Sequence, residues 1–383
     1  MLTEGTTATR VNSTFISEKI SRVRWIPEQY DESSNFITTS WDLDVNNVKV
    51  WKLVRNDYAG GLDEEEDENE FVPRCTAEIC FTGDISGLEF VGDGHCVVSN
   101  TEGFVSLVAL DRERDEDQLE ERFRFENLHR FDTFSTMNGA PCTALSVHDT
   151  DVATVGEDGR LNVLSTVGQK VLRSISSADS CTISCVAFLN PKEVLTGNRL
   201  GIIKSFDIRA ESQKPTGSFA VSCEDEKRSN SVTCLAFHPT QRHIILAGSE
   251  EGSITVWDLR QPQFPASYLK AHEHAITELA FHRTQPSRLF SASEGGELWQ
   301  WNQNTLPSAA SCTTGLIHDT TSSATVAADT NNPWLNGERA KSKIAVTSLL
   351  SGIRKAINSF DSCRSKVICG GDNEAIYLLE NVI

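Results

Sequence analysis

A repeated pattern of short apolar strands is the feature that most constrains how this chain can fold. In its clearest copy, Val232-Thr-Cys-Leu-Ala-Phe is followed by Ile244-Ile-Leu-Ala-Gly-Ser and then by Ser253-Ile-Thr-Val-Trp-Asp. Three apolar, β-branched segments separated by turn residues predict three antiparallel strands, with a fourth strand before the next copy. A sheet with two apolar faces is not stable alone, so such copies must stack on one another. The pattern therefore predicts an all-β propeller.

The first strand of the repeat recurs often enough to predict seven blades. Its apolar-x-x-apolar-x-aromatic pattern begins at Ile20, Ile85, Cys142, Ile183, Val232, Ile276 and Ile357. Three of the intervals between these starts are close to the roughly 40–45 residues of a WD-type blade. The longer intervals contain an acidic loop at 55–73, a charged loop at 111–121 and a long insertion in the sixth blade at 304–342. Because the blades of a closed ring share their interfaces, we expect residues 1–383 to form a single domain.

The two ends of the chain supply complementary parts of one blade. After the last first strand, only residues 366–369 and 375–379 have strand character, so that blade is one strand short. Residues 14–19 precede the first copy and have no blade of their own. Pairing 14–19 with the last blade removes an open sheet edge, which otherwise promotes aggregation. We expect this ring-closing strand, and we expect 344–350 to be the outer strand of the sixth blade.

Charge and cysteine content limit the possible functions. The formal net charge is −19, and no Lys/Arg cluster is present, so direct binding of nucleic acid or membrane is disfavoured. The acidic run at 63–70 and the charged run at 111–121 are typical of solvated loops, with recruitment of a basic partner segment as the alternative. Eleven cysteines without a Cys-x-x-Cys pair fit a reducing compartment. With no signal-peptide pattern or membrane span, we expect a cytosolic or nuclear protein.

The sequence contains no pattern that indicates catalysis, and we expect no enzyme activity, cofactor or metal. It has no Gly-x-Ser-x-Gly elbow and no phosphate-binding Gly-rich loop. His272-Glu-His274 could suggest a metal pair, but no Cys or carboxylate cluster completes a ligand set. His272 lies just before a first strand, where a hydrogen bond within the blade is the favoured interpretation. Asp158-Gly159 is typical of a turn that joins two strands.

Several large rings have the positions of structural residues. Trp257 and Trp301 fall on third strands, where we expect them to pack between blades, and we place Trp51 with them as structural. The pairs Trp257-Asp258, Phe206-Asp207 and Trp301-Asn302 each end a third strand and resemble the WD-repeat family. This resemblance implies a seven-bladed WD-repeat propeller.

The resemblance to the WD-repeat family is uneven at the turn acid. Asp158 matches the family, whereas the equivalent sites are Glu102, Leu200, Glu251 and Gly295. The His–Ser–Trp–Asp hydrogen-bond network of that family is therefore expected to be incomplete in most blades, and the chain is identified as a divergent member.

Stretches outside the generic repeat positions resemble one family of nucleoporins. Residues 16–25, 154–162, 346–350 and 369–377 are similar to the forty-three-kilodalton nucleoporins, which are propeller subunits of the Y-shaped outer-ring complex of the nuclear pore. The resemblance spans nearly the whole chain, including Pro333-Trp-Leu335 in the insertion. In agreement with a scaffold rather than an FG-repeat protein, none of the 18 Phe residues is followed by Gly.

The nucleoporin resemblance implies a scaffold subunit that docks other proteins. It places the chain at the nuclear pore of the nuclear envelope, on the short arm of the Y beside helical-solenoid subunits. It further implies support of pore assembly, mRNA export and protein import, and a role at kinetochores during mitosis.

An alternative function comes from another class of WD-repeat proteins. Trp257-Asp-Leu-Arg260, with Phe206-Asp-Ile-Arg209 one blade earlier, resembles the WDxR motif by which some propellers bind the adaptor of a cullin-type ubiquitin ligase. On this interpretation the chain is a substrate receptor. Asp-x-Arg also commonly closes a third strand, which favours a structural role. Recognition of a histone tail through the acidic loops is a third, weaker hypothesis.

Overall fold

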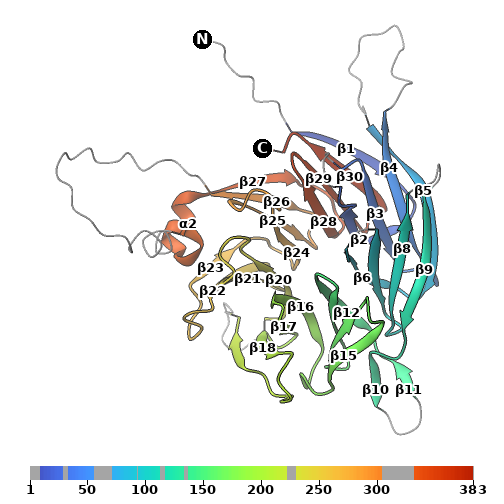
Figure 1. Ribbon diagram of the computed structural model, residues 1–383. Coiled ribbons are helices and arrows are strands. Elements are labelled where there is room, and N and C mark those ends of the chain that lie inside the picture. The colour runs from blue at the N-terminus through green and yellow to red at the C-terminus, as the bar shows by residue number, and fades with distance from the viewer. Residues whose placement is uncertain are drawn as a thin grey trace, which may run out of the picture.

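The computed structural model describes residues 9–28, 33–55, 71–92, 94–112, 117–132, 137–221, 230–303 and 332–382. Seven four-stranded antiparallel sheets stand around a central channel like the blades of a propeller (Figure 1). A short hairpin, β10 (Arg130–Asp132) with β11 (Met137–Gly139), extends from the connection between the second and third blades. The predicted fold, an all-β seven-bladed propeller, is confirmed.

The first three blades follow one another in chain order, each with its first strand at the channel. The first blade consists of β2 (Lys19–Trp25), β3 (Asn35–Trp41), β4 (Val45–Arg55) and β5 (Phe71–Thr82). The second consists of β6 (Ile85–Phe90), β7 (His95–Asn100), β8 (Val105–Asp111) and β9 (Gln118–Phe125). The third consists of β12 (Cys142–His148), β13 (Asp151–Gly156), β14 (Leu161–Ser165) and β15 (Lys170–Ile175).

The remaining blades repeat this order. The fourth consists of β16 (Ile183–Asn190), β17 (Glu193–Asn198), β18 (Ile202–Asp207) and β19 (Gly217–Ala220). The fifth consists of β20 (Val232–Phe237), β21 (Ile244–Ser249), β22 (Ser253–Asp258) and β23 (Ser267–Lys270). The sixth consists of β24 (Ile276–Phe281), β25 (Arg288–Ser293), β26 (Leu298–Gln303) and β27 (Ile344–Leu350). The seventh consists of β28 (Ile357–Cys363), β29 (Lys366–Gly371), β30 (Ala375–Glu380) and β1 (Arg10–Phe15).

The position of a strand in its blade explains its composition. The second strand β21 is buried along its whole length because both of its faces pack inside the ring, and its sequence is apolar with small residues. The outer strand β15 is mostly exposed and carries Lys and Arg. The core is divided into clusters between neighbouring blades. One cluster, for example, joins Leu195 and Ile203 of the fourth blade to Ile245 and Trp257 of the fifth.

The N-terminal strand closes the ring, as predicted, but at different residues. β1 pairs antiparallel with β30, with Arg10 opposite Glu380 and Phe15 opposite Ala375. The strand predicted at 14–19 is therefore shifted toward the N-terminus, because Lys19 already begins the first blade. A turn at Ser17, with φ of 61°, separates the two strands. Since β1 covers the edge of β30, the last blade has its full set of four strands.

The strands beside the predicted loops are longer than expected. β4 and β5 include Arg55 and Phe71, so the acidic loop predicted at 55–73 is too wide at both ends, and its run at 63–70 lies outside the described residues. β8 extends to Asp111 and β9 begins at Gln118, which corrects the charged loop predicted at 111–121. In both hairpins the backbone ladder continues past the predicted loop ends, with Arg55 opposite Phe71 and Asp111 opposite Gln118.

The insertion predicted as a loop at 304–342 has helical structure at its end. Residues 304–331 lie outside the described part of the chain. They are followed by a 3-10 turn, η1 (Pro333–Leu335), and by α2 (Gly337–Lys343), which leads directly into β27. The side chain of Asn336 caps α2 by accepting hydrogen bonds from the N–H groups of Glu338 and Arg339. The outer strand predicted at 344–350 is confirmed as β27.

Candidate functional site

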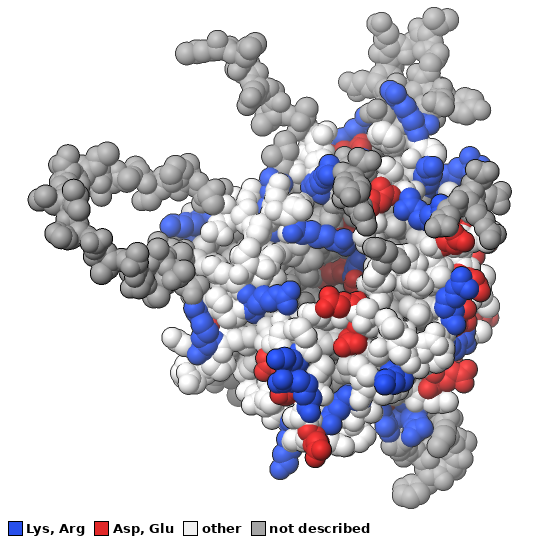
Figure 2. Space-filling view, in the orientation of Figure 1, with Lys and Arg blue, Asp and Glu red and all other residues white. Residues whose placement is uncertain are grey.

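The central channel is lined by the first strands of all seven blades. It holds a cavity of about 590 Å³. Figure 2 shows the hollow at the centre of the ring, with acidic and basic side chains inside it. Most lining residues are neutral, but β2 contributes Arg22 and Arg24. Alternate residues of a strand point to the same side, which is why two arginines two positions apart both face the channel.

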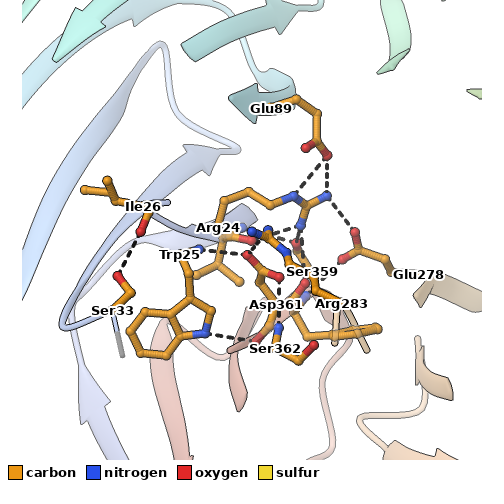
Figure 3. A network of polar contacts seen from close by, with 12 residues as sticks. Arg24, Trp25, Ile26, Ser33, Glu89, Glu278, Arg283, Ser359, Asp361 and Ser362 are labelled. Carbon is orange, nitrogen blue, oxygen red and sulfur yellow. Dashed lines mark hydrogen bonds and ion pairs between the residues drawn. The ribbon is translucent and has the colours of Figure 1, made fainter. Parts of the chain in front are cut away.

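Arg24 is the centre of a polar network inside the channel (Figure 3). Its Nη2 atom lies 2.8 Å from Oε1 of Glu89 and 2.7 Å from Oε1 of Glu278. Its Nη1 atom donates to Oγ of Ser359 at 2.9 Å. Glu89 belongs to the second blade, Glu278 to the sixth and Ser359 to the seventh. One guanidinium of the first blade therefore contacts three other blades.

A second group of contacts surrounds Asp361 on β28. Its Oδ2 atom accepts a hydrogen bond from the backbone N–H of Trp25 at 2.9 Å and pairs with Nη2 of Arg283 at 2.8 Å. The indole N–H of Trp25 donates to the carbonyl of Asp361 at 3.2 Å. Arg22 donates to the carbonyls of Ser86 and Asn358. The seam between the first and seventh blades, which are the two ends of the propeller, is thus held by buried polar contacts.

The electrostatics of the network differ at its two buried carboxyl groups, favouring the ionised form at Glu278 but not at Asp361. Burial alone raises the pKa of Glu278, but the charges of Arg24 and Arg22 outweigh burial and lower that pKa. Burial raises the pKa of Asp361, against the opposing charges of Arg283 and Arg24. Because removing one partner from such a cluster leaves an uncompensated buried charge, the network fixes the relative positions of the blades. The network therefore has a structural role, which is to hold neighbouring blades together by ion pairs and hydrogen bonds.

His272 forms a complete network in the sixth blade, contrary to the expectation for that blade. Nδ1 of His272 is 2.9 Å from Oε2 of Glu297, and Nε2 is 2.8 Å from Oγ of Ser291. The indole N–H of Trp301 donates to the same Ser291 oxygen at 2.9 Å. The WD-repeat pattern places the acid at the position of Gly295. In this blade the acid is instead Glu297, two residues later. The longer glutamate side chain reaches the imidazole from the shifted position.

Asp158 takes part in a similar network in the third blade. Its Oδ1 atom is 2.9 Å from Nδ1 of His129, and Nε2 of His129 is 3.0 Å from Oγ1 of Thr154. Asn162 lies on the third strand opposite Thr154, at the position that Trp299 has opposite Ser291 in the sixth blade. Its amide nitrogen is 3.4 Å from the same imidazole nitrogen. Burial lowers the pKa of His129, but Cys142 and Asp158 outweigh it and raise that pKa to about 9. Asp158 therefore holds a histidine in place at the turn.

The other residues singled out in the sequence lie in separate blades and form no common site. The indole of Trp51 donates to Oγ1 of Thr38 at 2.8 Å. Phe206 and Trp257 are buried between blades, and the indole nitrogen of Trp257 has no hydrogen-bond partner among the described residues. Asp207 and Asp258 pair with Arg209 and Arg260, the arginines two residues further on. Each of these residues thus contacts neighbours in its own part of the ring, and the structural residues singled out in the sequence do not form one site together.

The described residues were also compared with what a metal site or a membrane-spanning helix requires. Within the described ranges, no group of three or more His, Cys, Asp or Glu side chains is arranged to hold a metal ion. No helix in that part of the chain is long and apolar enough to cross a membrane. His272, for which the sequence favoured a hydrogen bond within the blade over a metal site, uses both ring nitrogens in the network described above.

The channel network was missed in the sequence, although a signal for it exists. Arg22 and Arg24 are charged residues inside a predicted first strand, and Glu278 and Asp361 are charged residues in the first strands of later blades. A charged residue at an inward position of a buried strand requires a partner of opposite charge. The blades that supply the partners of these arginines are determined by the geometry of the ring. The spacing of residues along the chain does not reveal them.

Comparisons with known proteins agree with the propeller fold and also identify related proteins. The family model described as "Vps8 beta-propeller" matches residues 159–350, so this half of the chain belongs to the propellers which that model describes. The chain is similar to the human nucleoporin Nup43, with 30% identity over 96% of this chain and 98% of the relative. It is also similar to the nuclear pore complex protein NUP43 of Arabidopsis thaliana, with 26% identity over 65% of this chain and 69% of the relative. Among solved structures, the WD40 propeller domain of Doa1 superimposes with a TM-score of 0.65 over 98% of this chain and 97% of that chain, at 12% identity, and shows the fold alone.

Proposed function

We propose a scaffold function in the nuclear pore for this chain, which belongs to the family of the nucleoporin Nup43. The observation that carries the proposal is the extent of the match, which runs nearly end to end in both chains and includes every blade. A match confined to the generic repeat would support the propeller fold without the pore assignment.

The physical mechanism that we propose is docking of a rigid ring against other pore subunits. The buried contacts between the first, second, sixth and seventh blades hold the ring closed, so that its loops and outer strands present fixed surfaces. The partners that we propose are helical-solenoid nucleoporins on the short arm of the Y-shaped outer-ring complex. A specific contact of this kind has an area of about 1,600 Å² in total. We propose no enzymatic activity, no cofactor and no direct contact with nucleic acid or membrane.

The finer parts of the function follow from the same family assignment. We propose that the chain supports pore assembly and, through the pore, mRNA export and protein import. We further propose that it accompanies the complex to kinetochores in mitosis.

Localisation and affinity purification test the scaffold function. The fluorescently tagged protein is expected at the nuclear rim, and it is expected to co-purify in stoichiometric amounts with helical-solenoid subunits. Because shape-matched contacts carry the binding, it should survive moderate salt, which screens contacts between exposed charges. A diffuse protein without pore partners would contradict the proposal.

The variant Arg260→Ala separates this function from that of a ligase substrate receptor. Nε of Arg260 donates to Oδ1 of Asp258 at 2.9 Å, and its Nη2 atom lies 2.7 Å from Oδ2. Arg209 and Asp207 repeat this pairing one blade earlier, which supports a role in closing the strand. Arg260→Ala should therefore leave binding to pore subunits intact. Loss of all partners in this variant would support the ligase interpretation instead.

A further inference from the structure

Trp334 fills a groove between the fifth and sixth blades. It is fully buried, and its ring packs edge to face on Phe281 with 5.9 Å between ring centroids. Its carbonyl accepts a hydrogen bond from Oγ of Ser267 at 2.6 Å. Just before it, Nδ2 of Asn332 donates to Oε1 of Gln241 at 2.7 Å. The chain itself therefore shows what kind of segment occupies such a groove: a short turn that inserts one aromatic ring.

The equivalent groove one blade earlier is open. A cavity of about 470 Å³ lies between the fourth and fifth blades and is lined by Leu189, Leu195, Ser205, Gly217, Phe219 and Leu259. Strand register establishes the equivalence. Ser205 pairs with both Leu195 and Gly217, just as Val256 pairs with both Leu246 and Ser267 in the fifth blade. Gly217 thus has the position of Ser267, the residue that holds Trp334.

The floor and the rim of this groove suit an aromatic ring. A Cβ atom at Gly217 would approach only Oγ of Ser205, at 2.9 Å, so the absence of a side chain leaves space above the strand. The lining residues Pro262 and Gln263 are followed by Phe264, whose side chain is 81% exposed. A large apolar ring exposed beside an apolar groove is typical of a binding surface.

The rim also carries positive charge. Lys192 and Arg242 are exposed and have no ion-pair partner among the described residues, and Arg242 donates to the carbonyl of the lining residue Leu189 at 3.2 Å. The nearby carboxylate of Glu193 already accepts a hydrogen bond from Asn190 at 2.7 Å. In a chain with a net charge of −19, this local excess of cations favours an acidic partner.

We propose that the groove between the fourth and fifth blades binds a segment of a partner protein that contains a Trp or Phe followed by an aliphatic residue and flanked by acidic residues. The ring enters above Gly217, as Trp334 enters above Ser267. The undescribed segments that follow the fourth blade and interrupt the sixth in sequence, 222–229 and 304–331, contain no Trp, Phe or Tyr, and we infer that the ring comes from another chain. This surface is independent of the pore assignment.

A similar cavity between the second and third blades supplies a natural control. It also measures about 470 Å³ and is lined in part by Leu107 and Val167. Leu107 pairs with Val97 and Phe123, so Phe123 occupies the position of Gly217. Its ring packs on Phe125, with 4.8 Å between centroids. The strand position that has no side chain in the fourth blade thus carries an aromatic side chain here, and we expect no second ring in that groove.

Binding of a labelled peptide to the full chain tests the proposal. The probe is a fluorescein-labelled peptide with the sequence of residues 329–338, in which Asp and Glu flank Pro-Trp-Leu. We expect saturable binding by fluorescence anisotropy, with a dissociation constant below about 1 mM. Gly217→Leu should weaken binding at least tenfold, and replacing the tryptophan of the peptide by alanine should do the same. Val167→Leu, beside the control groove, should change binding less than twofold.

Two further variants keep the test decisive if Gly217→Leu fails to fold. Phe264→Ser changes an exposed side chain and should weaken binding several-fold with an unchanged melting temperature. Reversing the rim charges with Lys192→Glu and Arg242→Glu should weaken it too, more strongly at low salt. The proposal would be overturned if the dissociation constant of the peptide were unchanged by these substitutions, or if Val167→Leu altered it. Self-association of the chain that disappears in Phe264→Ser would also overturn it, because the occupant would then be a second copy. None of these outcomes bears on localisation to the nuclear rim.

Discussion

Arg24 of β2 and Glu278 of β24 form an ion pair of 2.7 Å across the channel, joining the first blade to the sixth. The seventh blade lies between these two in the ring and adds Ser359 and Asp361 to the same network. Both paired side chains are largely buried, with 12% and 14% exposed. Residues that are more than half the chain apart in sequence thus depend on each other for charge compensation.

Replacing Arg24 by methionine should strongly destabilise the propeller. The substitution keeps the apolar volume but leaves the carboxylates of Glu89 and Glu278 without their partner. Breaking a buried ion pair on one side costs about 3–5 kcal/mol. The measurement is the free energy of unfolding from urea denaturation, compared with that of the unaltered chain.

The matched control for Arg24→Met is Arg209→Met. Arg209 also pairs with a carboxylate, Asp207, but its side chain is 58% exposed. Exposed pairs contribute about 0–1 kcal/mol, so this variant should unfold almost as the unaltered chain does. Equal losses for the two arginines would contradict the structural role of the channel network.

Acidification should destabilise the chain through His238. Burial and the nearby charge of His243 lower the pKa of His238 to about 4. Nδ1 of His238 accepts a hydrogen bond from the N–H of Gln241, which a protonated ring cannot do. The unfolded chain therefore binds this proton first, and stability is lost as the pH falls from about 6.5 toward 4.

The pH effect is measured by comparison with His238→Gln. With partial solvent screening taken into account, the histidine should account for about 2 kcal/mol of the acid-dependent loss. The variant should show a flatter decline in unfolding free energy between pH 6.5 and 4. Identical pH profiles would show that His238 does not stay neutral in the folded state.

Deletion of β1 tests the closure of the ring. Removing residues 1–15 deletes β1, which pairs with one edge of β30, and leaves β30 as an open edge while β29 still pairs with its other side. We expect aggregation or a large drop in melting temperature, because exposed edges associate with other chains. Removing only residues 1–9 leaves β1 whole and should change the melting temperature little. Closure by β1 would be disproved if the two truncated proteins were equally stable.

Much of the fold was predictable because the repeat leaves a local signature in each blade. The apolar first strands at Ile20, Ile183 and Ile276 lie within β2, β16 and β24. Both ends of β1 were misplaced, since a strand that completes a blade from the other end of the chain has no neighbouring turn to mark its register. Its pairing partner, β30, is the last strand in sequence.

The polar networks were harder to predict because they depend on distances between blades. His272 forms its hydrogen bonds within one blade, but its acid Glu297 lies two residues after the position expected for the acid. His129 was missed, although it contacts Asp158, because it follows the second blade across a connection of irregular length. Arg24 needed partners from three other blades, and no spacing along the chain encodes that arrangement.

Trp334→Ala should destabilise the chain even though the residue lies in an insertion. The indole is fully buried against Phe281, and α2 and β27 follow it directly, so its loss leaves a cavity between the fifth and sixth blades. Truncation of a buried Trp costs about 3–5 kcal/mol. The control is Val346→Ala on β27, where the side chain is 46% exposed and a loss below about 1 kcal/mol is expected. Urea denaturation of both variants measures the difference, and equal stability would mean that the groove between these blades does not need its aromatic occupant.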